Sequence, residues 1–128
     1  MVTLTEGRYA SDWLKREADS LFSREEAVIA SGAGVVVSGT VVGKITASGK
    51  YKPVTIAATD GSEDAAGIVM WDVDATSADA HAVIIARDAI VVHQGLKYGA
   101  DVDTSGERAA IHTALGALNP PILVREGA

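Results

Sequence analysis

Histidine is the residue of this sequence most often used for metal binding and proton transfer, and it occurs three times. His81, His93 and His112 lie 12 and 19 residues apart. Short zinc motifs leave about three to five residues between paired histidines, so these spacings match none of them. We expect histidines on strand faces and at the surface, and the spacing leaves open whether the fold brings any of them together.

The acidic run DGSED at residues 60–64 suggests a calcium loop. An EF-hand loop that started at Asp60 would need Gly at position 65 and Glu at position 71. The chain has Ala65 and Trp71 at those positions. The motif therefore fails, and Asp60-Gly61 predicts a solvated turn instead, with no bound metal.

The sequence contains no recognisable nucleophile with its base. It has no Cys and no G-x-S-x-G motif, and the pair Gly32-Ala-Gly34 lacks the third Gly and the following helix of a dinucleotide fingerprint. A small hydrolase would need Ser, His and Asp side chains that come together in the fold, and no motif in the sequence indicates which residues these would be. We therefore expect no enzyme activity, no catalytic residues and no cofactor.

Composition narrows the class of protein further. The chain has 128 residues, of which 48% are apolar and only 5% aromatic, so one domain with a core of Val, Ile, Leu and Ala is expected. A net charge of -6 with scattered Lys and Arg disfavours a nucleic-acid partner. No stretch approaches the roughly 18 apolar residues of a membrane span, and no signal peptide is seen at the start. We expect a protein made in the cytoplasm, without a nucleic-acid or membrane partner.

The chain divides into an N-terminal arm, residues 1–22, and a body, residues 23–128. The arm is polar at first, and SDWLKREADSLF at 11–22 has helix-like apolar spacing behind a possible Ser11 cap, which predicts a short helix. The segment is too short to be stable alone, so its apolar side chains either dock on the body or wait for a partner. In the body, strands are expected at about 25–30, after Gly34, at 40–47 and in GIVMWDVDA from 67. HAVIIARDAIVV from 81 should form either one long strand or two short strands bent at Arg87-Asp88. The segment at 51–57 should be an edge-like strand because Pro53 has no N–H to donate.

One convincing helix is expected near residues 104–118. Thr104 and Glu107 form a capping box, and apolar residues then repeat at the helical interval up to Leu118. Two prolines end the helix, and ILVRE forms a final strand. The predicted fold class is a β-rich α+β protein, a small single domain of short strands with one C-terminal helix and a flexible N-terminal arm.

These elements carry a resemblance to a known family. The order and spacing of several short motifs are similar to those of the lambda-type head decoration proteins of tailed bacteriophages, which stabilise the capsid. The motifs are REEAV at 24–28, GTVVGKI at 39–45, DGS at 60–62, AGI at 66–68, RDA at 87–89, LG at 115–116 and the last strand ILVR. Each is common in β proteins, and the likeness spans roughly residues 5 to 126.

The resemblance implies a structural virion protein. It implies a homotrimer on the outer surface of the capsid at three-fold positions, bound to the major capsid protein and stabilising the expanded head, without enzyme activity or cofactor. The lambda-type arm is rich in Ser, Thr, Pro and Ala, so this arm departs from it. The candidate capsid contacts lie in the arm and just after it. They are Trp13, Leu14, Leu21, Phe22, Arg24 and Glu25.

One alternative remains open, a small β-barrel that binds a ligand or acts as a carrier. A lipoyl-type carrier would present a modified lysine at a hairpin tip. Lys50, in ASGKYK, lies at a turn but lacks the flanking sequence of such a site. An added mass on the native protein would identify the carrier.

Overall fold

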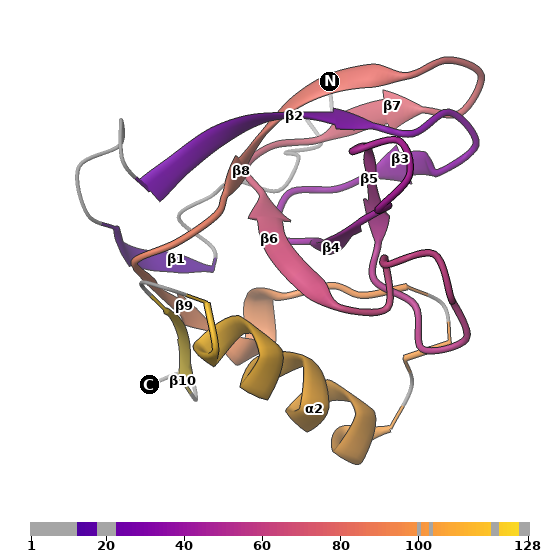
Figure 1. Ribbon diagram of the computed structural model, residues 1–128. Coiled ribbons are helices and arrows are strands. Elements are labelled where there is room, and N and C mark those ends of the chain that lie inside the picture. The colour runs from indigo at the N-terminus through magenta and orange to yellow at the C-terminus, as the bar shows by residue number, and fades with distance from the viewer. Residues whose placement is uncertain (1–12, 18–22, 100, 103, 119–120, 126–128) are drawn as a thin grey trace, which may run out of the picture.

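Five short strands close into a barrel in the computed structural model of the chain (Figure 1). The structure describes residues 13–17, 23–99, 101–102, 104–118 and 121–125. Around the barrel the strand order is β2-β5-β4-β6-β8. The bounds are Arg24–Ile29 for β2, Tyr51–Pro53 for β5, Val41–Lys44 for β4, Ala65–Val69 for β6 and Ala80–Ile85 for β8.

The longest pairing of the barrel joins β2 and β8. They run antiparallel from Arg24↔Ile85 to Ile29↔Ala80, and alternate residues turn their side chains into the barrel. Apolar side chains from the barrel strands and from neighbouring segments pack together here; the fully buried ones are Ile29, Val36, Val42, Val69, Ala75 and Ile84. The barrel is therefore a packed core in the described part of the chain.

Strand β5 corrects one expectation, since it is not an edge strand. It pairs with β4 on one side, and on the other with β2 through Ile29↔Tyr51. Pro53 lies beyond the short pairing with β2, so the missing N–H of proline is tolerated there.

Gly43 in β4 allows a loop to cross close over the barrel. A Cβ at this position would lie 2.2 Å from the backbone oxygen of Ser62. Any larger residue would push the 60–64 turn away from the strand.

A second sheet packs outside the barrel. Its central strand is β9 (Ala89–Val92), which pairs antiparallel with β1 (Leu14–Glu17) and parallel with β10 (Ile122–Arg125). Helix α2 (Ser105–Gly116) lies next to β10 (Figure 1). Two further short strands, β3 (Gly34–Val36) and β7 (Val73–Ala75), pair antiparallel.

The main hydrophobic core lies between the barrel, this sheet and α2. Ile68 and Ile85 from the barrel meet Trp13, Leu115 and Ile122 from the outer layer, and all five side chains have 0% exposure. Burial of such large apolar side chains contributes about 1.5–3 kcal/mol each. The sheet and the helix are therefore held to the barrel mainly by apolar packing.

The predicted fold class is confirmed. The described residues form ten strands, with helix α2 towards the C-terminus. The helix begins where it was expected, because the side chains of Thr104 and Glu107 form the capping box. Of the two alternatives for HAVIIARDAIVV, the structure has two strands, β8 and β9, with the bend at Arg87-Asp88, where Asp88 has a φ of 51°.

Two further predictions of local structure are wrong. GIVMWDVDA forms two strands, β6 and β7, because the chain turns at Met70–Asp72. The helix expected over residues 11–22 is a strand at Leu14–Glu17, where pairing with β9 overrides the helical spacing. Residues 1–12 and 18–22 lie outside the described residues.

Candidate functional site

Large apolar side chains exposed to solvent mark possible contact surfaces on this protein. Among the described residues four stand out: Val35 is 63% exposed, Trp71 48%, Ile56 46% and Leu123 42%. A tryptophan exposed by half is unusual, since its area normally drives burial or protein contact. We therefore treat the surroundings of Trp71 as the candidate site.

Both neighbours of Trp71 are fixed to the body. The Met70 N–H donates to the Val83 carbonyl at 2.9 Å. The Ser38 N–H donates to Asp72 Oδ1 at 2.8 Å. The indole is therefore presented from a short turn whose backbone is held on each side.

A buried chain of hydrogen bonds extends this support into the core. The Trp13 indole Nε1–H donates to Ser38 Oγ at 2.9 Å, and the Ser38 hydroxyl donates to the Met70 carbonyl at 2.7 Å. The buried Trp13, directly before β1, thus helps to position the turn that carries the exposed Trp71.

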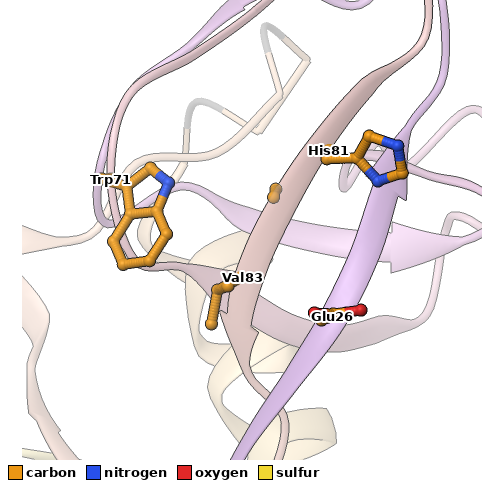
Figure 2. Close-up of a pocket in the computed structure, with 5 residues that line it drawn as sticks. Glu26, Trp71, His81 and Val83 are labelled. Atoms are coloured by element: carbon orange, nitrogen blue, oxygen red, sulfur yellow. The ribbon is translucent and has the colours of Figure 1, made fainter.

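Beside Trp71 the surface is hollowed, as Figure 2 shows. The hollow has a volume of about 350 Å³ and is lined by Glu26, Trp71, His81, Ala82 and Val83. Glu26 and Val83 are cross-strand partners in β2 and β8, which places their side chains next to each other on the outer face of the barrel.

The chemistry of the hollow is that of a contact surface. Trp71 and Val83 supply apolar area, and Glu26 supplies an exposed carboxylate that has no ion-pair partner among the described residues. The neighbouring Glu25 is engaged, because its Oε2 lies 3.2 Å from Arg87 Nη2. An apolar wall with one free anion suits a partner that brings an apolar side chain and a cation.

The structure corrects the expectation for Trp13. Its side chain has 0% exposure and belongs to the main core, so it offers no surface to a capsid. Leu14 is half-buried and packs against the same core.

The other expected capsid contacts have mixed outcomes. Leu21 and Phe22 lie outside the described residues. Arg24 is half-buried and Glu25 is exposed at the start of β2. Their contact with a capsid stays a prediction.

Two of the three histidines converge, which the sequence spacing left open. The rings of His93 and His112 are 5.0 Å apart between centroids and nearly perpendicular. The Tyr98 hydroxyl lies 2.6 Å from His112 Nε2, and burial raises the pKa of this hydroxyl to about 12. His81 lies apart, exposed on β8 at the Trp71 hollow. In the described ranges no group of three or more His, Asp or Glu side chains is placed to hold a metal ion.

The acidic run forms the expected turn. Asp60 Oδ1 accepts hydrogen bonds from the Ser62 hydroxyl at 2.6 Å and the Ser62 N–H at 3.1 Å. Lys52 Nζ lies 3.0 Å from the other carboxylate oxygen. The pKa of Asp60 is held well below its usual range, mainly by the hydrogen bond from the Ser62 hydroxyl and next by Lys52. Lys50, the residue considered for a carrier, forms an ion pair with Asp79 at 2.6 Å.

Sequence reasoning missed Trp71 as a surface residue. It treated the residue as one position of a continuous strand, whereas the turn after β6 places it outside the ladder. The available signal was Asp72, a residue that favours turns, directly after a large aromatic residue.

No helix in the described part of the chain is long and apolar enough to cross a membrane.

Comparison with known proteins agrees with the family motifs found in the sequence. No curated protein matches the chain. A family model described as bacteriophage lambda head decoration protein D matches residues 3–120, which is nearly the whole length. The chain therefore belongs to the bacteriophage lambda head decoration protein D family.

Proposed function

We propose that this protein binds the outer surface of a phage head as a homotrimer at three-fold positions and stabilises the expanded shell. The observation that carries the proposal is the family match over residues 3–120. The major capsid protein is the proposed partner, and the proposed role requires neither catalysis nor a cofactor.

The surface of the body supports such a role. A packed barrel presents exposed apolar side chains, among them Trp71 and Ile56, from turns and strands that the core holds in place. Contacts from a rigid surface lose little conformational entropy on binding. Three copies joined in a ring can raise the overall affinity by about 10² to 10⁴ over one weak contact, provided that all three bind at once.

The N-terminal segment supplies the proposed capsid contacts. Leu21, Phe22, Arg24 and Glu25 are the residues we retain from the sequence, together with the half-buried Leu14. Trp13 is left out because it is buried in the core.

The test uses expanded empty heads, lacking any decoration protein, from the phage that encodes this chain. Purified protein is titrated onto the heads, and bound protein is measured by co-sedimentation and by cryo-electron microscopy. We expect saturable density in groups of three at the three-fold positions and a higher temperature of head disruption. Unexpanded heads serve as the control and should bind less. Absence of saturable binding to expanded heads would contradict the proposal.

A further inference from the structure

A second exposed patch on this chain complements the Trp71 hollow. It lies on the outer face of the β9–β10 pair. Leu123, 42% exposed, pairs with Ile90, and the exposed Arg125 pairs with Val92, so these four side chains share one face of the sheet. The opposite face of β10 turns Ile122 into the core near α2. The patch therefore consists of apolar side chains with a cation at its end.

The two patches match in chemistry. The hollow combines Trp71 and Val83 with the carboxylate of Glu26, and the patch combines Leu123 with the guanidinium of Arg125. Neither Glu26 nor Arg125 has an ion-pair partner within the described ranges of the chain. Opposite charges beside apolar surface are the arrangement that selects and orients a protein partner.

The two patches also lie on different parts of the molecule. β10 lies beside α2 in the lower half of Figure 1, while β2 and β8 cross the upper half. Two different but complementary patches on one chain produce head-to-tail contacts, which close into a ring when the rotation permits. A trimer needs a contact of this kind, because a two-fold contact stops at a dimer.

We propose that the β9–β10 face of one copy docks on the Trp71 hollow of the next, with Leu123 against Trp71 and Val83 and with Arg125 meeting Glu26. The occupant of the hollow is thus a second copy of this chain. The inference rests on the proposed trimer and assigns the surfaces that form it.

Cysteine cross-linking tests this contact, because the chain has no native Cys. The full-length double variant His81→Cys/Leu123→Cys is bound to expanded heads, treated with a short bis-maleimide and separated on a denaturing gel. We expect covalent dimers and trimers. Each single variant should remain monomeric, and an equal mixture of the two should give dimers but no trimers.

A matched control pair places the first thiol on another surface. Asp64 is exposed and lines a separate hollow with Ile56 and Ile111. The variant Asp64→Cys/Leu123→Cys should give no linked trimer on the same heads. If it links as well as the first pair, crowding on the head produces the links and the assignment is overturned.

Charge exchange provides a second measurement that does not depend on thiol chemistry. Glu26→Arg alone and Arg125→Glu alone should each weaken head occupancy at least about tenfold. The double exchange Glu26→Arg/Arg125→Glu should restore occupancy, whereas Asp64→Arg should leave it unchanged. If both single variants lose head occupancy and the double exchange does not restore it, the proposed pairing of Glu26 with Arg125 is overturned.

The outcomes separate this inference from the proposed function. If wild-type protein decorates heads in groups of three but the His81/Leu123 pair does not link, the surface assignment is wrong and the function stands. If wild-type protein does not decorate heads, the proposed function is wrong, and the surface assignment that rests on it is wrong as well. If Trp71→Ala abolishes decoration while linkage at the paired thiols is absent, the hollow contacts the capsid protein instead of a second copy.

Discussion

At the scale of single residues, the two tryptophans of this chain have opposite roles. Trp13 is buried with its indole N–H bonded to Ser38, and Trp71 is 48% exposed. Trp13→Ala should lower the free energy of unfolding by about 3–5 kcal/mol, because it leaves a cavity in the main core. Trp71→Ala, the matched control, should change it by less than about 1 kcal/mol. Urea denaturation followed by circular dichroism measures both.

Trp13→Phe separates the hydrogen bond from the packing. It keeps most of the apolar volume but removes the donor to Ser38, whose hydroxyl still bonds the Met70 carbonyl. The cost should therefore be smaller, about 0.5–1.5 kcal/mol plus a packing loss. Equal costs for Phe and Ala at position 13 would contradict the structure at this site.

Carboxylates that accept backbone hydrogen bonds make the free energy of unfolding depend on pH. The pKa of Asp101 is held below its usual range mainly by the hydrogen bond from the Ala57 N–H, and also by the one from the Ile56 N–H. A lowered folded-state pKa stabilises the fold above the unfolded value of about 4, and this contribution is lost as pH falls through the folded pKa. Asp60 shifts in the same direction through Ser62 and Lys52.

We therefore expect the free energy of unfolding to fall as pH is lowered below about 4. Asp101→Asn should be less stable at pH 7 and should lose less on acidification. The measurement is the urea concentration at the midpoint of unfolding, taken from pH 7 to below pH 4. A wild-type midpoint that rises as the pH falls would contradict this prediction.

At the scale of elements, helix α2 depends on one apolar face. Leu115 is fully buried and Ile111 is 5% exposed, and both belong to the main core. Leu115→Ala should cost about 2–5 kcal/mol in chemical denaturation. Leu118→Ala is the matched control, and its half-buried side chain should cost less. A cost below half a kilocalorie for Leu115→Ala would mean that this face of α2 does not pack on the body.

At the scale of the whole molecule, the N-terminal segment cannot be treated as an appendage. The sequence predicts a flexible N-terminal arm over residues 1–22, but Trp13 and β1 are part of the core and of the outer sheet. A truncation that begins at Trp13 keeps both, whereas one that begins at Ser23 removes both. The second should be less stable than the first by at least the cost of Trp13→Ala, about 3–5 kcal/mol. Thermal unfolding of the two truncations at equal concentration measures the difference, and equal melting temperatures would contradict it.

The sequence alone determined the features that depend on neighbours along the chain. The capping box of Thr104 and Glu107 and the turn at Asp60 are formed by residues within a few positions of one another. Such contacts cost little loop entropy, so local patterns predict them well. The family motifs are similarly local, and their order along the chain led to the family that the match over residues 3–120 shows.

Only the tertiary structure decided the features that depend on distant partners. Residues 14–17 lie in a segment with helical spacing, yet they form a strand because β9, more than seventy residues later, offers its edge. The same long-range packing buries Trp13 against Ser38, brings His93 beside His112 and leaves Trp71 on the surface. Local sequence cannot rank these outcomes, because strand pairing and burial gain their free energy from residues that only the folded chain brings together.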